Sequence, residues 1–494
     1  MSDERPTAHL ESGAQQRAAN LALLATAGTR LLALGSLFVA VFAVYWSILR
    51  TFFALDDFTW LLAAQDPDAA GFMRGAFTEN ATPFWRPMVD AYFYAEWRVF
   101  GFEATGYHVS NVLIHGMNAS LLAILGWQLS RSLLTGFAAG LLFAVLPTYD
   151  IAVSWVSSVT ELLAVFFYLL SLVLYIAHRR GMSWPLMYVA SIVALLFALL
   201  TKESAVSEPL VILGVALFVD MPRSRRDAIE LVKDITPFAL LGLAYFVFRY
   251  VESYGNVSDN GLYRFGWHGF QNFWDYVQWM ALPLRDGEYA WAENARPVAG
   301  ALFLASGVLA VVFRWRLPAL AFLWMVAAIT SYVFFLGGTY LRYTYMAAAP
   351  FSLFVVSMAA TLGQLVIAKA KTNGYATTVA RGAGVAVILL VAAFMAREAH
   401  DMQERLAGFA RDYRELYVQV TALCGDVPPQ GHVFVMDSPI FDYYGGNTRS
   451  LVNVAYDEVN VFKGVSPLPP WAATVENKCV VSYDKGSKRY VRTQ

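Results

Sequence analysis

Charged residues are scarce in this chain. They make up 15% of its 494 residues, whereas hydrophobic residues make up 58%; a soluble domain carries roughly 25% charged and about 45–50% apolar residues. The formal net charge is −1, so basic residues are not in excess. The first value excludes an ordinary soluble globular protein, and the second excludes nucleic acid as a partner.

Cysteine is also scarce, with Cys424 and Cys479 as the two in the chain. Two thiolates cannot build a structural zinc site or an iron–sulfur cluster. They form a disulfide if this part of the chain lies in an oxidising compartment, and otherwise remain buried free thiols. The sequence leaves both alternatives open. It has no short-period repeat and no low-complexity tract, which excludes a solenoid array.

Long apolar runs are what the chain has in abundance. A helix needs about 20 mostly apolar residues to cross a hydrocarbon core of roughly 30 Å. We identify eleven runs, at 31–53, 109–129, 133–147, 160–178, 184–201, 204–220, 235–251, 298–313, 317–336, 343–367 and 383–396. The predicted fold class is an all-α polytopic membrane bundle of about eleven transmembrane helices with a small α/β C-terminal domain.

Arginine and lysine in the short loops set the orientation, because they favour the cytoplasmic side. Alternate loops hold basic groups, such as Arg179 with Arg180, and Arg223 with Arg225. This bias predicts a multi-pass protein of the plasma (inner) membrane, with a first span that acts as a signal anchor. An odd number of spans then places the C-terminus outside.

Three parts follow from this orientation. They are a cytoplasmic N-terminal tail (1–30), a transmembrane module (31–396) with long outer loops at 54–108 and 252–297, and an extracytoplasmic C-terminal domain (397–494). In the first loop, apolar residues from Trp85 to Val99 recur at helical spacing and predict a helix along the membrane surface. The C-terminal domain pairs an amphipathic helix with strand-like runs, which are "HVFVMDS", "SLVNVAY" and "KCVVSYD".

Two adjacent carboxylates, Asp56 and Asp57, directly follow the first span. Close to an apolar boundary they repel one another, which raises the pKa of one of them. Successive side chains point in different directions, so at most one is the base for a given substrate. The alternative is that one of them caps the following "FTWLLAAQ" helix.

A polar stripe lies in the segment "YHVSNVLIHGMNA". At 100° per residue, His108, Asn111, His115 and Asn118 fall within an arc of roughly 80° on one helix face. Such a stripe usually joins neighbouring helices by hydrogen bonds. The alternative is that it forms one wall of an active cavity.

Further ionisable residues lie at the same outer boundary. In "LLTKESAVSEP", Lys202 suits an anionic group, and the alternative is a local pair with Glu203 or Glu208. Glu161 begins the fourth span and faces the same compartment.

Two guanidiniums with aromatic neighbours, Arg86 in "FWRP" and Arg342 in "YLRYTY", lie at this depth too. For both, the alternative is interfacial snorkelling. The shared depth of these groups favours a single site.

In this order the segments resemble the membrane glycosyltransferases with the C-type fold, above all the protein O-mannosyltransferases and their relatives with tetratricopeptide repeats. The matching segments are "LDDFTW", "WRPM", "YHVSNVLIHGMNA", "GLLFAVLPTYDIAVSWVSSVTELLAVFFYLLSL" and "LLTKESAVSEP". One departure is Asp-Asp where the protein mannosyltransferases have Asp-Glu.

The resemblance implies a hexosyl or mannosyl donor carried on a polyprenyl phosphate, and a protein, glycan or lipid acceptor on the extracytoplasmic side. It puts the catalytic carboxylate on Asp56, with Asp57 as the alternate. The expected donor-phosphate residues are Arg86, Lys202 and Arg342, of which the last two are preferred. The expected cavity-lining residues are His108, Asn111, His115, Glu161 and Glu203.

The chemistry needs charge stabilisation at the departing phosphate and removal of a proton from the acceptor hydroxyl. One base on the far side of the sugar gives inversion, unlike hydrolysis by paired carboxylates. We find no third ligand beside His108 and His115, so we expect no obligatory metal, although a divalent ion remains possible. The competing function is a membrane transporter or lipid-linked sugar flippase, but such proteins typically show inverted repeats with helices broken at the midplane, and we identify none.

Overall fold

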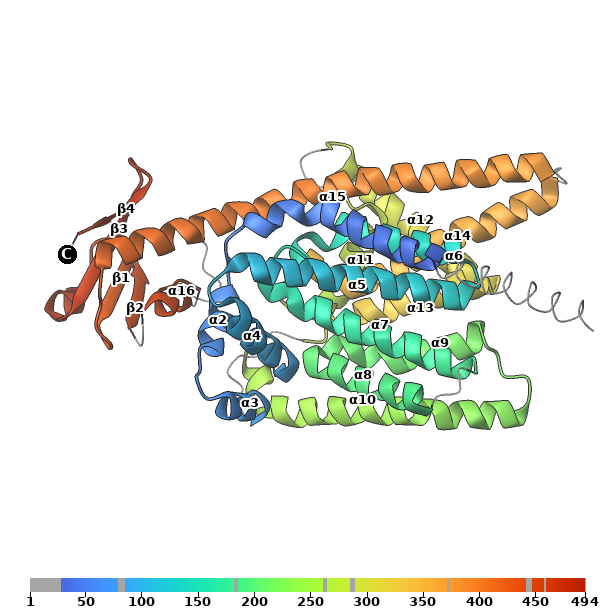
Figure 1. Ribbon diagram of the computed structural model, residues 1–494, viewed down its shortest axis with the longest axis horizontal. Coiled ribbons are helices and arrows are strands. Elements are labelled where there is room, and N and C mark those ends of the chain that lie inside the picture. The colour runs from blue at the N-terminus through green and yellow to red at the C-terminus, as the bar shows by residue number, and fades with distance from the viewer. Residues whose placement is uncertain are drawn as a thin grey trace, which may run out of the picture.

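A computed structural model describes residues 28–78, 85–181, 185–260, 264–284, 289–370, 374–440, 447–456 and 459–493. Most of the predicted N-terminal tail (1–30) lies outside these residues. The described chain is a long helical bundle with a small sheet at one end (Figure 1).

The bundle is built from helices that run along its long axis. They are the N-terminal helix (Gly28–Arg50, with η1 at Trp46–Arg50), α5 (Ala104–Ser130), α6 (Leu133–Val145), α7 (Val159–Arg179), α8 (Pro185–Thr201), α9 (Glu208–Phe218), α10 (Arg225–Asn260), α11 (His268–Ala281), α12 (Ala292–Val312), α13 (Arg316–Thr330), α14 (Tyr345–Ala370) and α15 (Gly374–Cys424). Each of the eleven predicted spans falls on one of these helices.

Six of the described helices are long and apolar enough to cross a membrane. They are Gly28–Arg50, Ala104–Ser130, Val156–Arg179, Arg225–Arg249, Ala292–Val312 and Leu341–Ile367, and shorter apolar helices lie at Leu133–Tyr149, Pro185–Thr201 and Arg316–Thr330. The chain is therefore a multi-pass membrane protein, while the count of eleven spans stays a prediction.

Short helices cover the end of the bundle that carries the sheet. These are α2 (Asp57–Ala64), α3 (Ala69–Thr78) and α4 (Pro87–Phe100), between the first span and α5 (Figure 1). Helix α4 confirms that the segment with helically spaced apolar residues is a helix, while its place along the membrane surface stays a prediction. The loop predicted at 252–297 is largely helical where it is described, because α10 continues to Asn260 and α11 follows.

Turns of 3-10 helix connect several of the long helices. They are η2 (Pro147–Ala152), η3 (Val156–Ser158), η4 (Glu203–Ser207), η5 (Leu341–Thr344) and η7 (Pro470–Thr474), the last within the C-terminal unit. The first four bring the chain round at the end of the bundle where α2 and α4 lie.

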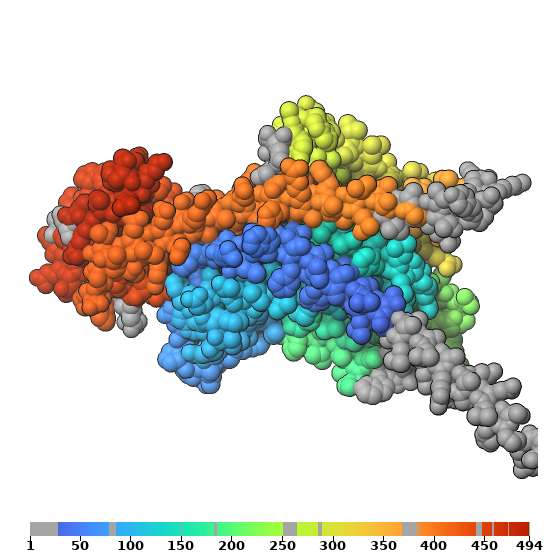
Figure 2. Space-filling view, turned by 45° about the horizontal axis from the view of Figure 1, so that its top comes forward, coloured from blue at the N-terminus to red at the C-terminus, as the bar shows by residue number. Residues whose placement is uncertain are grey.

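Helix α15 leaves the bundle and leads into the sheet. It lies beside the N-terminal helix along one face, and the C-terminal residues protrude beyond the bundle (Figure 2). The sheet has the order β2-β1-β3-β4, in which β1 is parallel to both neighbours and β4 is antiparallel to β3. Its elements are β1 (His432–Met436), α16 (Asn447–Ala455), β2 (Asn460–Gly464), β3 (Lys478–Asp484) and β4 (Arg489–Arg492).

Two of the three predicted strands are confirmed, as β1 and β3. The third prediction is wrong, because "SLVNVAY" forms most of α16. The reason is topological: β1 and β2 are parallel neighbours, and joining parallel strands requires a crossover, which is usually a helix.

A disulfide between Cys424 and Cys479 joins the end of α15 to β3. The C-terminal unit also contacts the bundle through α16, whose Ser450 Oγ lies 3.1 Å from Thr59 Oγ1 on α2. The ring of Phe58 lies 5.4 Å from that of Tyr413 on α15. Helix α2 is thus held from both the bundle and the C-terminal unit.

Candidate active site

The two adjacent carboxylates lie at a sharp turn between the first span and α2. Leu55 adopts a left-handed backbone with φ of 56° and is buried. This conformation is unusual for a bulky residue and persists only where the surroundings impose it, as functional sites often do. Asp56 occupies the N-cap position of α2, but its side chain makes no capping hydrogen bond.

Asp57 holds the local backbone together. Its Oδ2 accepts a hydrogen bond from the Ala54 N–H at 2.8 Å, and its Oδ1 accepts from the Ser157 N–H at 2.7 Å and from the Ser157 hydroxyl. The side chain is buried, and burial raises its pKa to about 7 against these hydrogen bonds. Asp57 therefore ties α2 to η3 through hydrogen bonds to both of its carboxylate oxygens.

Asp56 differs from its neighbour because its Oδ1 is buried without a hydrogen-bond partner among the described residues. Burial raises its pKa to about 6, while the charges of Arg342 and Arg86 act in the opposite direction. A buried carboxylate oxygen without a partner is costly, and a carboxyl group with a raised pKa in such a position is a candidate functional residue. Of the two acidic residues, Asp56 is the one with free acceptor capacity.

Lys202 is already paired. Its ammonium forms an ion pair with Glu161 at the start of α7, and both side chains are only 2–3% exposed. The rings of Tyr332 and Tyr343 lie 5.2 and 4.7 Å from Lys202 Nζ. The partner is therefore Glu161 from another helix, not the local Glu203 or Glu208 that the sequence offered as the alternative.

Arg86 forms an ion pair with Glu203. Its Nη2 lies 3.4 Å from both carboxylate oxygens of Glu203. The glutamate next to Lys202 in the sequence therefore neutralises a guanidinium from α4. One turn further along α4, Asp90 lies in the field of Arg86, and burial raises the pKa of Asp90 to about 6. Snorkelling does not describe Arg86, since its side chain is only 13% exposed.

Arg342 is the predicted phosphate residue that forms no ion pair with any described carboxylate. Its guanidinium lies among the rings of Trp155, Tyr340 and Tyr343, at 4.7–5.1 Å from their centroids, and Nη2 lies 3.3 Å from the Tyr343 hydroxyl. The charges of Asp56 and Glu161 act on it through space. The structure thus brings Asp56, Lys202 and Arg342 into one charged cluster.

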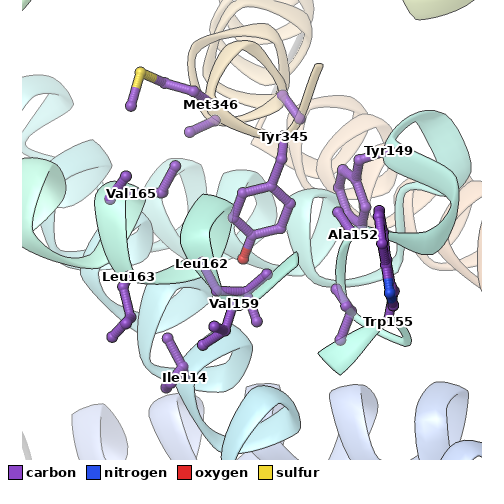
Figure 3. Packing of buried hydrophobic residues seen from close by; sticks show 14 of the residues in the cluster. Ile114, Tyr149, Ala152, Trp155, Val159, Leu162, Leu163, Val165, Tyr345 and Met346 are labelled. Atoms are coloured by element: carbon purple, nitrogen blue, oxygen red, sulfur yellow. The ribbon is translucent and has the colours of Figure 1, made fainter. Parts of the chain in front are cut away.

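The polar stripe on α5 makes interhelical hydrogen bonds. Asn111 donates to backbone carbonyls near η3, at 3.1 Å for Trp155, and Asn118 donates to the Leu162 carbonyl at 2.9 Å. His115 lies 2.8 Å from the Tyr345 hydroxyl, and Figure 3 shows Tyr345 directed from α14 toward Leu162 and Val159.

His108 lies 2.9 Å from Thr51 Oγ1 and is buried like the rest of the stripe. Of the two alternatives for these residues, their contacts favour packing. Of the residues expected to line the cavity, Glu161 and Glu203 are the ones that belong to the charged cluster.

Several residues that contact the site were not predicted from the sequence. Ser157 binds Asp57, Tyr332 and Tyr343 flank Lys202, and Tyr345 joins α14 to the polar stripe. The aromatic run around Arg342 was a usable signal for Tyr343 and Tyr345. Nothing in the sequence marked Ser157, which lies 100 residues from Asp57.

Among the described residues, no group of three or more His, Cys, Asp or Glu side chains is arranged to hold a metal ion. The expected independence from an obligatory metal stays a prediction.

Comparison with known proteins defines the class: the chain resembles the C-type membrane glycosyltransferases, as the sequence predicted. It is 29% identical over 179 residues to the protein O-mannosyl-transferase Tmtc1 of Drosophila melanogaster, and 29% identical over 192 residues to Tmtc2 of the same organism. Each match covers 34% of this chain and 20% of the relative, so it spans about a fifth of the length of these curated relatives. No protein-family model matches the chain.

The fold is similar to that of the Archaeoglobus fulgidus oligosaccharyltransferase, whose structure was determined with a tethered acceptor peptide. The TM-score is 0.50 at 11% identity, and the match covers 87% of this chain and 63% of the other. At this identity the likeness concerns the fold alone.

Proposed function

We propose that this protein is a glycosyltransferase that moves a sugar, of the hexosyl or mannosyl type, from a polyprenyl-phosphate carrier to an acceptor hydroxyl. Transfer takes place on the extracytoplasmic face with inversion at the sugar carbon. The observation that carries the proposal is the pairing pattern of the charged cluster. Lys202 and Arg86 are neutralised by glutamates, and Asp57 accepts hydrogen bonds at both oxygens. By contrast, Arg342 forms no ion pair with a described carboxylate, and Oδ1 of Asp56 has no hydrogen-bond partner among the described residues.

In the proposed step, Asp56 accepts the proton of the acceptor hydroxyl as its oxygen bonds to the sugar carbon. The bond from that carbon to the phosphate oxygen breaks, and its electron pair leaves with the lipid phosphate. Arg342 stabilises the charge that grows on the phosphate by charge-assisted hydrogen bonds. One general base and one cation suffice, because phosphate leaves without protonation.

The position of the cluster supports an enzyme over the competing transporter. Asp56 precedes α2, Glu161 begins α7, Lys202 follows α8 and Arg342 precedes α14. All of these groups lie at helix ends on one side of the bundle. A transport site would be expected near the midplane instead.

The disulfide supports the extracytoplasmic placement, because such bonds persist in oxidising compartments. The acceptor, whether protein, glycan or lipid, binds on the same side in this proposal.

The decisive experiment separates turnover from donor binding in the purified full-length protein. With labelled polyprenyl-phosphate mannose, Asp56→Asn should lower the transfer rate by about 10²–10⁴-fold, the usual contribution of a general base, and leave donor binding unchanged. Arg342→Ala should weaken donor binding by roughly tenfold to a hundredfold, since a hydrogen bond to a charged group contributes about 1.5–3 kcal/mol.

Glu103→Gln is the matched control, because Glu103 is an exposed carboxylate at the same end of the bundle with no capping hydrogen bond. It should behave as wild type. Wild-type transfer by Asp56→Asn would remove Asp56 as the base and leave Asp57 or Glu161 as the candidates. Unchanged donor binding by Arg342→Ala would remove Arg342 from the phosphate site.

A further inference from the structure

Three arginines gather at the end of α5 that is remote from the charged cluster. Arg30 comes from the N-terminal helix, Arg131 caps the C-terminus of α5 with φ of 61°, and Arg180 follows α7. Helix α5 has 27 residues, which at 1.5 Å per residue is about 40 Å, so this arginine triad and Asp56 lie at opposite membrane faces. Figure 1 shows α2 and α4 at the other end of α5.

The triad converges on the last turn of α5. The Arg30 guanidinium lies 4.4 Å from the centroid of the Trp127 ring, and an Arg180 Nη donates a hydrogen bond to the Gln128 carbonyl. The Arg131 N–H donates to the Trp127 carbonyl at 2.8 Å. Three positive charges from three chain segments therefore share one helix terminus.

No carboxylate neutralises these charges within ion-pair distance in the described chain. Asp220 acts on Arg180 only at longer range, and Arg131 repels it. Two other arginines near this face are paired: Arg179 lies 2.8 Å from Asp234, and Arg226 lies 3.1 Å from Glu230.

Two general effects account for part of the arrangement. The negative end of the α5 dipole attracts cations, and cytoplasmic loops favour arginine. Neither of these two effects explains why three guanidiniums gather at one turn without a carboxylate to balance their charge. In addition, Arg180 Nε and Gln128 Oε1 are buried without hydrogen-bond partners among the described residues.

Exposed leucines adjoin the triad. Leu31 and Leu32 follow Arg30 and are 70% and 77% exposed, while Leu133 and Leu134 begin α6 directly after the Arg131 turn. Such side chains suit lipid acyl chains. Cations at the membrane boundary beside apolar side chains match the two parts of a phospholipid.

We propose that the arginine triad is a binding site for the phosphate headgroup of an anionic phospholipid, with its acyl chains against the exposed leucines. The guanidiniums donate bidentate hydrogen bonds to the phosphate oxygens, as arginine does in phosphate sites. The bound lipid then joins the N-terminal helix, α5 and α7 at this face. The site is independent of the proposed transferase activity.

The test uses the full-length protein in detergent, with native mass spectrometry to count bound lipids. Phosphatidylglycerol should bind at least tenfold more tightly than phosphatidylcholine of the same chain length. In the combined variant Arg30→Gln, Arg131→Gln and Arg180→Gln this preference should disappear. Arg226→Gln, which removes a paired arginine from the same membrane face, should keep it.

Equal binding of the two lipids by wild type would overturn the proposal, and this comparison needs no variant to fold. A preference retained by the triple variant would overturn it as well. Displacement of phosphatidylglycerol by millimolar inorganic phosphate would identify a site for free phosphate and not for a lipid.

Discussion

Asp56 and Asp57 are adjacent and chemically identical, yet their surroundings give them different roles. Both carboxylate oxygens of Asp57 accept hydrogen bonds from backbone N–H groups, those of residues 54 and 157. By contrast, Oδ1 of Asp56 has no hydrogen-bond partner in the described chain. Asp57 therefore holds the local backbone, while Asp56 is the carboxylate with an oxygen free to accept a further hydrogen bond.

The raised pKa of Asp56 predicts the pH dependence of transfer. A general base must be ionised, and burial raises the pKa of this carboxyl group to about 6. We expect kcat/KM to rise about tenfold per pH unit below pH 6 and to level off above pH 7. The measurement is an initial-rate profile from pH 4.5 to 8, with circular dichroism to verify that the protein stays folded. A flat profile between pH 5 and 7 would rule out Asp56 as the titrating group.

The buried pair of Lys202 and Glu161 predicts a non-additive effect on stability. Lys202→Met alone leaves the Glu161 charge buried without its partner, at a cost of about 3–5 kcal/mol. The double variant Lys202→Met with Glu161→Gln removes both charges and should recover most of that loss. Thermal unfolding in detergent measures both variants. A double variant no more stable than the single one would contradict the pairing.

At the scale of elements, α5 and α6 approach one another through glycine. A Cβ at Gly136 would lie 2.3 Å from the Ala123 carbonyl oxygen and 2.6 Å from the Trp127 nitrogen. Small residues allow this close approach of membrane helices, which packing then stabilises. The same contact supports the end of α5 where the arginine triad lies.

Gly136→Ala should therefore lower the melting temperature, because the added methyl group meets backbone that cannot move aside cheaply. Overpacking of this kind costs about 1–3 kcal/mol. Gly363→Ala on α14 is the control, since a Cβ there meets nothing within 4 Å. It should leave the melting temperature unchanged or raise it. Equal effects of the two substitutions would show that the α5–α6 contact is not tight.

At the scale of the whole molecule, α15 links the bundle to the C-terminal sheet as one helix of 51 residues. It passes residue 397, where the sequence predicted the C-terminal domain to begin, without a break. The disulfide fixes its end to β3, and α16 packs against α2. The helix that follows Asp56 therefore contacts both the bundle and the C-terminal unit.

The predicted orientation is tested by a fusion at the C-terminus. Arginine-rich loops such as that of Arg179 and Arg180 predict that this end lies outside, so an alkaline phosphatase fusion should be active and a fluorescent-protein fusion dark. The reverse pattern would place Asp56 on the cytoplasmic side and contradict transfer on the extracytoplasmic face.

The sequence by itself determined the membrane bundle and the two strands β1 and β3. It did so because apolar runs of about 20 residues and alternating strand patterns are local properties of the chain. It also placed Asp56, Lys202 and Arg342 at one end of the bundle, where the structure brings them together, since residues at the same end of successive spans share a depth.

Only the tertiary structure decided which of these residues is left unpaired. Asp57 is bound by Ser157 from 100 residues away, Lys202 by Glu161, and Arg86 by Glu203, and all three contacts join separate elements. It also made residues 447–455 a helix, because the strands on either side of them are parallel. Pairings between distant segments depend on how helices and strands pack, which no local pattern encodes.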